Sequence, residues 1–130
     1  MSIYNVYTVF DDIGRARWHL QSDSDPIVEQ GWKYAVGQYE YDTHYWNGAP
    51  TLRPVMGTTI DTLSVVANSA NFCTISGIVQ GAEVFVNNEL QGIVNDGNAE
   101  LTFDTPGVYT VELILFPYVN DGYVVNALQP

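Results

Sequence analysis

The feature that most constrains this chain is the alternation of apolar and polar side chains in its C-terminal half. Such alternation is typical of a strand that buries one face. The alternating apolar positions are Ala82, Val84 and Val86; Ala99, Leu101 and Phe103; and Tyr109, Val111, Leu113 and Leu115. Turn residues, such as Asn87-Asn88, separate these segments, as in antiparallel sandwiches. We therefore predict an all-β fold with a sandwich in this half.

The N-terminal half is also predicted to form strands, divided by Gly, Pro, Asn and Asp. Residues 11–14 are expected to form a tight turn, and Asn47-Gly48 a type I′ hairpin turn. The strands predicted around them are 3–10, 15–20, 32–41 and 51–55. The one helical signal lies in residues 24–31, where Asp25 would cap the helix, Pro26 would begin it and Gly31 would end it. We predict one or two helical turns there.

The first strand carries apolar side chains on both of its faces. Residues 4, 6 and 10 would lie on one face, and residues 3, 7 and 9 on the other. A strand of this kind is either covered on both sides or contacts another chain. Because a sheet of about 50 residues has little with which to cover it, we expect a homo-oligomer.

The charge of the chain is negative and unevenly distributed. Its 130 residues carry a net charge of -11, and all four basic residues precede residue 54. So few basic side chains disfavour binding to nucleic acid or to an anionic membrane surface. No leader segment and no apolar run of about 18 residues is visible, so no membrane span is expected. The asymmetry predicts two domains, a sheet module over 1–56 and a sandwich over 57–130.

No combination of residues predicts catalysis, a metal site or a cofactor. His19 and His44 are 25 residues apart and have no partner at a metal-ligand spacing. The glycines form no phosphate-binding loop. Two Asp/Asn clusters, near residues 23–25 and 95–98, have the oxygen ligands that calcium prefers, but each is more simply a cap or a turn. Cys73 has no partner for a disulfide, and we expect it to be a small core residue. The protein is therefore not expected to be an enzyme.

Aromatic side chains are the most functional-looking feature of the N-terminal half. Aromatic rings bury a large area at low entropic cost and dominate many interfaces. The candidate interface residues are Tyr4, Tyr7, Trp18, Trp32, Tyr34, Tyr39, Tyr45 and Trp46. Two other interpretations stay open. The rings could form the core of a small sheet, or they could stack on a sugar as a carbohydrate platform.

Short motifs along most of the chain resemble proteins of the tail-fibre region of tailed bacteriophages. In the first half these motifs are Tyr4-Asn5-Val6-Tyr7, Gly14-Arg15, Tyr45-Trp46-Asn47-Gly48 and Arg53-Pro54. In the second half, residues 81–87 and 104–111 resemble the immunoglobulin-like (Ig-like) sandwiches often appended to virion proteins. Here Tyr109, near the start of its strand, resembles the tyrosine corner of that fold.

The resemblance implies a structural component of a virion, assembled in the host cytoplasm, with other virion proteins as its partners. The aromatic sheet would dock to a partner or to sister copies, and the acidic sandwich would project outward. Two alternatives remain. One is an adhesion module that binds a host-surface glycan through the region of Trp32, Tyr45 and Trp46. The other is a tail-fibre assembly chaperone.

Overall fold

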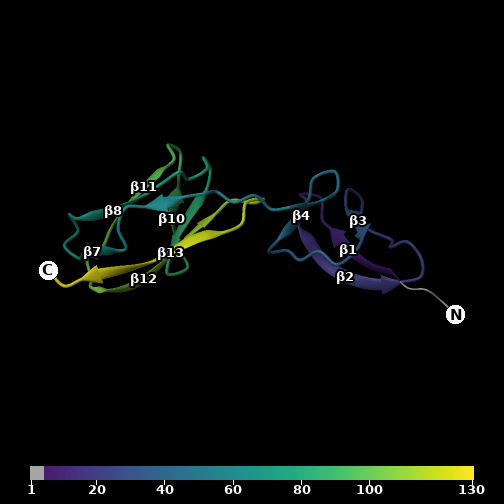
Figure 1. The fold of residues 1–130 in the computed structure, drawn as a ribbon, viewed down its shortest axis with the longest axis horizontal. Helices are drawn as coiled ribbons and strands as arrows, with labels where there is room; N and C mark the ends of the chain where they lie inside the picture. The colour runs from purple at the N-terminus through teal and green to yellow at the C-terminus, as the bar shows by residue number, and fades with distance from the viewer. Residues whose placement is uncertain (1–4) are drawn as a thin grey trace. The chain divides into compact units, whose positions relative to one another are not determined.

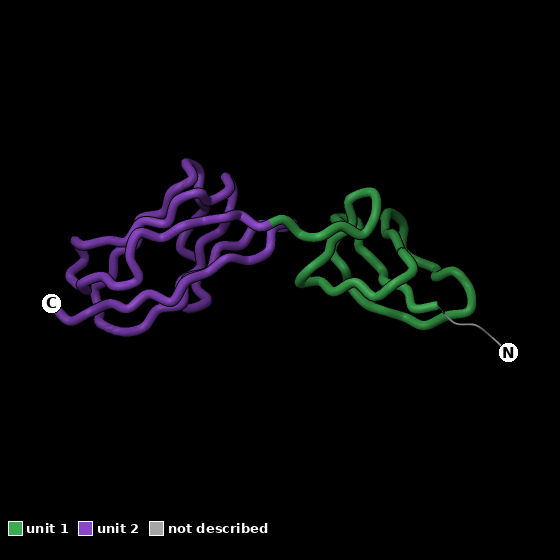
Figure 2. The backbone as a smooth tube through the Cα atoms, viewed as in Figure 1, with its two compact units in different colours: residues 1–54 green, residues 55–130 purple. Residues whose placement is uncertain are grey.

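The structure is a computed structural model that describes residues 5–130. The chain divides into two compact units, Met1–Pro54 (unit 1) and Val55–Pro130 (unit 2), shown in Figure 2. The sequence placed this boundary two residues later, after residue 56. All regular secondary structure within residues 5–130 is β-strand, so the predicted all-β fold is confirmed. No helix in this range has the length and apolar character needed to cross a membrane.

Unit 1 contains a three-stranded antiparallel sheet and a separate hairpin (Figure 1). Its strands are β1 (Asn5–Phe10), β2 (Ala16–Ser22), β3 (Lys33–Val36), β4 (His44–Trp46) and β5 (Pro50–Leu52). The sheet order is β2-β1-β3, with β1 in the centre, and β4 pairs with β5. Of the first predicted strand, residues 3 and 4 lie outside the described residues.

The turn between β1 and β2 is held by Asp11. One carboxylate oxygen accepts hydrogen bonds from the backbone N–H groups of Ile13 (3.1 Å) and Arg15 (2.9 Å). The other accepts a bond from Nε of Arg15 at 2.7 Å. The predicted turn at residues 11–14 is therefore present. Within it, the Asp11 side chain accepts hydrogen bonds from backbone N–H groups that the pairing of β1 with β2 leaves free.

The central strand β1 is covered on both faces within unit 1. Tyr7 and Val9 are buried on one face, and Thr8 and Phe10 on the other. Internal cover of residues 7–10 is one of the two possibilities that the sequence allowed. The burial of this strand gives no support to oligomerisation, which stays a prediction.

The third strand is shorter than predicted, because the chain turns over the sheet at Gly37. This glycine has φ +123° and donates from its backbone N–H to the carbonyl of Val6 (2.7 Å). Thr8 then donates its hydroxyl to the Gly37 carbonyl (2.7 Å) and accepts a bond from the backbone N–H of Tyr39 (2.9 Å). The segment after β3 therefore covers the sheet instead of extending it.

Two local predictions in unit 1 are wrong. Residues 25–30 form no helix: Ile27 is fully exposed, so no apolar face is buried to repay the cost of helix nucleation. Gly31 instead adopts φ +85° in a turn closed by a hydrogen bond from Trp32 N–H to Glu29 C=O (3.0 Å). The β4–β5 loop has three residues, since Trp46 pairs with Pro50, and only Gly48 in it has positive φ, so it is not type I′.

Unit 2 contains two sheets. Its strands are β6 (Thr59–Ile60), β7 (Ser64–Val66), β8 (Phe72–Ser76), β9 (Glu83–Val86), β10 (Glu89–Ile93), β11 (Asn98–Thr102), β12 (Gly107–Ile114) and β13 (Asp121–Leu128). One sheet has the order β10-β9-β12-β13-β7, and the other has the order β11-β8-β6. All pairs in unit 2 are antiparallel except β13 with β7, which is parallel.

The two sheets of unit 2 share one apolar core. Cys73 and Ile75 of β8, from one sheet, belong to the same buried cluster as Val111, Leu113 and Val125 from the other. The alternation predicted for β12 is confirmed, since the side chains between these buried positions are turned outward. Two further predictions are confirmed: Cys73 is a core residue, and Asn87-Asn88 forms a tight turn.

The turn at Asn87-Asn88 has the positive φ angles, 49° and 66°, that a type I′ hairpin requires. It joins β9 to β10 directly, because Val86 pairs with Glu89. Farther along, the hydroxyl of Tyr109 donates to the carbonyl of Thr105, four residues upstream, at 2.7 Å. This bond fixes the chain where it enters β12.

Candidate docking surface

The aromatic side chains of unit 1 lie on two opposite faces of its sheet. Trp18 and Tyr34 both pair with Val9, from the strands on either side of β1, so all three lie on one face. Tyr7 lies on this face two residues before Val9. The side chain of Phe10 points to the opposite face. We call these surfaces the Val9 face and the Phe10 face.

On the Phe10 face the aromatic rings form a core. The ring centroid of Phe10, a fully buried residue, lies 5.6 Å from that of Trp46 and 6.4 Å from that of Tyr39. Tyr39 also contacts His44, at 5.1 Å between centroids. Tyr39 and Trp46 therefore cover this face of the sheet. These two rings fit the interpretation in which the aromatic residues form the core of a small sheet.

On the Val9 face, one pair of rings reaches the surface. Trp18 retains 47% of its exposed area, and its ring centroid lies 5.2 Å from that of the half-buried Trp32. The guanidinium carbon of Arg17 lies 5.9 Å from the Trp32 ring centroid, within the range of a cation–π contact. We call Arg17, Trp18 and Trp32 the tryptophan patch.

The tryptophan patch depends on an irregularity in the sheet. Val9 pairs with Trp18, but Phe10 pairs with Ala16, so Arg17 is the extra residue of a β-bulge. A bulge re-aims the side chains next to it, and here Arg17 stands over the ring of Trp32. Arg17 was not predicted to be a site residue, because no short-range pattern in the sequence marks the position of the bulge.

The remaining rings of the Val9 face are more enclosed. Tyr7 is buried and contacts Tyr34 edge to face, with ring centroids 5.9 Å apart. The negative charge of Asp25 raises the pKa of the Tyr34 hydroxyl, and its hydrogen bond to Asp25 acts in the same direction. Val36 lies on the same face, since it pairs with Tyr7, and it is 59% exposed. Beyond the tryptophan patch, Val36 is therefore an exposed apolar residue of the Val9 face.

Two candidate interface residues remain, Tyr45 and Tyr4. Tyr45 is half-buried in the β4–β5 hairpin, opposite Thr51, and Tyr4 lies outside the described residues. Trp32 and Trp46, both predicted to belong to one glycan-binding region, lie on opposite faces of the sheet, since Trp32 contacts Trp18 and Trp46 contacts Phe10. They cannot stack on one sugar together.

The ionisable groups that the sequence singled out have structural contacts. Nε2 of His19 lies 2.9 Å from the Tyr39 carbonyl, and Nδ1 of His44 lies 2.8 Å from the Thr43 hydroxyl. Burial, with the negative charge of Asp61, raises the pKa of the Cys73 thiol. Among residues 5–130, no three His, Cys, Asp or Glu side chains are grouped so as to hold a metal ion.

Comparison with known proteins gives no relative from which a function could be transferred. The chain matches no protein-family model, no curated protein and no solved structure.

Proposed function

We propose that this protein is a non-enzymatic structural component of a tailed-phage virion that docks to other virion proteins, or to sister copies, through the tryptophan patch. The observation that carries the proposal is the exposure of Trp18 beside Trp32 and Arg17. Trp and Arg are the residue types that most often dominate binding energy at protein interfaces. The phage assignment is supported by the motif resemblance.

We further propose that unit 2 is an Ig-like domain. If β6 and β7 are strands A and A′, then β8 to β10 are B, C and C′, and β11 to β13 are E, F and G. The two sheets then have the orders E-B-A and C′-C-F-G-A′, which follow the arrangement of Ig-like sandwiches. The bond from Tyr109 to Thr105 supports this assignment, because it matches the tyrosine corner at the start of strand F.

The docking proposal is tested by assembly in the cell. Tagged chain is produced in the host cytoplasm during infection by the phage that encodes it, and particles are purified on a density gradient. We expect the wild-type chain in mature particles. Trp18→Ala should lower the amount bound at least about tenfold, as expected for a central interface residue. An assembly chaperone would be absent from mature particles.

The matched control is Phe72→Ala in unit 2. Phe72 is 49% exposed, close to the 47% of Trp18, so both substitutions remove a similarly exposed aromatic ring. Phe72→Ala should leave incorporation unchanged. The docking proposal is wrong if the wild-type chain is missing from particles, or if folded Trp18→Ala is incorporated as well as the control.

A further inference from the structure

On one side of unit 2, each of the two sheets ends in a strand with a free edge. Within the described residues, β10 pairs only with β9, and β11 only with β8. Residues 94–97 connect β10 directly to β11, so no strand closes this side. A free edge presents a row of unpaired N–H and C=O groups, on which a further strand can form.

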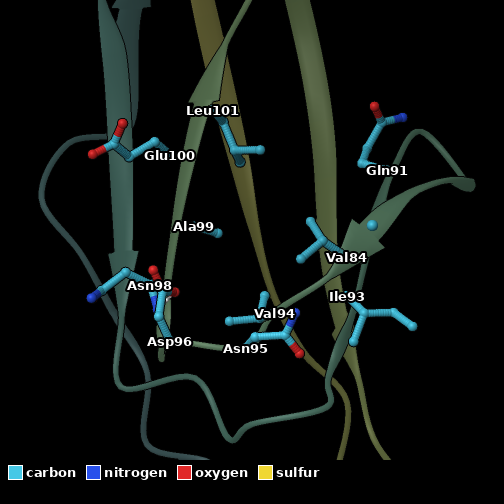
Figure 3. Close-up of a pocket in the computed structure, with 11 residues that line it drawn as sticks. Val84, Gln91, Ile93, Val94, Asn95, Asp96, Asn98, Ala99, Glu100 and Leu101 are labelled. Carbon is cyan, nitrogen blue, oxygen red and sulfur yellow. Dashed lines mark hydrogen bonds between the residues drawn. The ribbon is translucent and has the colours of Figure 1, made fainter.

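A groove of about 390 Å³ lies between these two edges (Figure 3). Leu101 on β11 and Val84 on β9 point toward one another across it, with Ala99 and Val94 nearby. Ile93 lines the groove at the β10 edge and is 59% exposed. The groove is thus an opening into the apolar core. An added strand with apolar side chains on one face would fill it.

The edge of β11 is the more regular of the two. Its pairing with β8 is continuous from Asn98 to Thr102, whereas the pairing of β10 contains a bulge near Gly92. Neither Pro nor Lys, which commonly protect a free edge, occurs in β11. Along β11, the half-buried Ala99 and Leu101 alternate with exposed polar residues, among them Glu100.

The charge of this surface determines what can pair with it. Residues 54–130 contain eight acidic and no basic residues, and Asp96 and Glu100 lie at the groove itself. Glu100 is the central residue of β11, so antiparallel pairing of two copies about this strand would place one Glu100 opposite the other. Like charges directly opposite one another destabilise a sheet. The edge therefore disfavours a second copy and favours a basic partner.

We propose that the free edge of β11 binds an extended segment of a partner protein in which apolar and basic residues alternate. The segment adds a strand to β11, its apolar side chains enter the groove beside Ala99 and Leu101, and its basic side chains lie beside Glu100. This site is in unit 2, so the proposal is independent of docking through the tryptophan patch.

The test uses two synthetic decapeptides, one of alternating lysine and valine and one of alternating glutamate and valine. Each is titrated into the ¹⁵N-labelled full chain. The lysine peptide should shift the amide resonances of β11, β10 and residues 94–97, and should slow hydrogen exchange along β11. The glutamate peptide should cause no such shifts. No response at these strands, or an equal response to both peptides, overturns the proposal. Concentration-dependent shifts of the same resonances without peptide would also overturn it, because they would mean that two copies of the chain pair through this edge.

A pair of charge reversals separates recognition at the edge from general attraction to an acidic protein. Glu100→Lys should weaken binding of the lysine peptide about tenfold, because it replaces attraction by repulsion beside the added strand. Glu112→Lys makes the same change of net charge on β12, in the other sheet, and should weaken binding less than about twofold. Equal losses in the two variants would show only non-specific attraction and would overturn the proposal.

Discussion

Asp11 is a buried carboxylate with several partners. Burial by itself raises its pKa, but hydrogen bonds from the backbone and side chain of Arg15, the charge of Arg15 and a bond from Ile13 outweigh this, so the pKa of Asp11 is lowered. Arg17 lies 3.6 Å from the same carboxylate. The ionised side chain therefore links the first turn to the tryptophan patch.

The lowered pKa of Asp11 predicts acid sensitivity of unit 1. The unfolded chain binds this proton at a higher pH than the folded chain, so the contribution of Asp11 to stability is complete above pH about 5 and is lost as the pH falls through about 4 and below. We expect the free energy of unfolding, from urea titrations followed by tryptophan fluorescence, to fall over this range. All three tryptophans are in unit 1, so the signal reports that unit.

The variant Asp11→Asn provides the control for this titration. It removes the carboxylate, so unit 1 should be less stable at neutral pH by about 1–3 kcal/mol, and the acid-dependent part of its stability should shrink. Parallel pH profiles for the wild type and the variant would contradict the assignment to Asp11.

At the scale of the element, the β9–β10 turn depends on residues that accept positive φ. Asn88 has φ 66°, a region that costs an ordinary side chain about 1–2 kcal/mol. Asn88→Ala should therefore destabilise unit 2 by about 1 kcal/mol, and Asn88→Gly should not. Hydrogen exchange of the Val111 and Val125 amides, in two strands of the core, would measure both changes. Equal stability of the two variants would show that the positive φ angle of Asn88 does not affect the stability of unit 2.

Strands β8 and β12 belong to different sheets but contribute residues to one buried cluster, which provides a test of the Ig-like assignment. In antibody domains a disulfide joins strands B and F, and its second cysteine follows the corner tyrosine by two residues. Cys73 lies on β8, and Val111 follows Tyr109 by two residues. Val111→Cys should therefore form a disulfide with Cys73 on oxidation, seen as the loss of both free thiols, and stabilise unit 2 by about 2–4 kcal/mol.

Leu113→Cys is the matched control for this experiment. Leu113 is as fully buried as Val111 and lies on the same strand, but it is one inward position farther along. Its thiol should stay reduced. A disulfide in the control and none in Val111→Cys would rule out the proposed correspondence of strands.

Each of the two units has its own core. The buried cluster of unit 2 contains none of the buried residues of unit 1, such as Val9 and Phe10. Leu113→Ala should therefore lower the stability of unit 2 by about 2–5 kcal/mol, measured by hydrogen exchange. The denaturation midpoint of unit 1, followed by tryptophan fluorescence, should not move. A shift of that midpoint would show that the units unfold together.

The residue pattern along the chain predicted the all-β class and three of the eight strands of unit 2, namely β9, β11 and β12. Period-two alternation identified the inward face of β12, because the side chains of a strand alternate whatever the strand pairs with. Cys73 was predicted to be a core residue because it is small and has no partner for a disulfide. The tight turn at Asn87-Asn88 could be predicted because few residue types accept positive φ at both positions.

The positions of the candidate sites depend on contacts between segments that are far apart in the chain. A bulge places Arg17 over Trp32, and β3 ends at Gly37, which is hydrogen-bonded to Val6 and Thr8. Both features depend on residues distant in the chain. The aromatic residues formed one group in the sequence, but pairing to Val9 or contact with Phe10 divided them between two faces. The free edges of β10 and β11 also have no local pattern, since an edge is defined by the strand that does not pair with it.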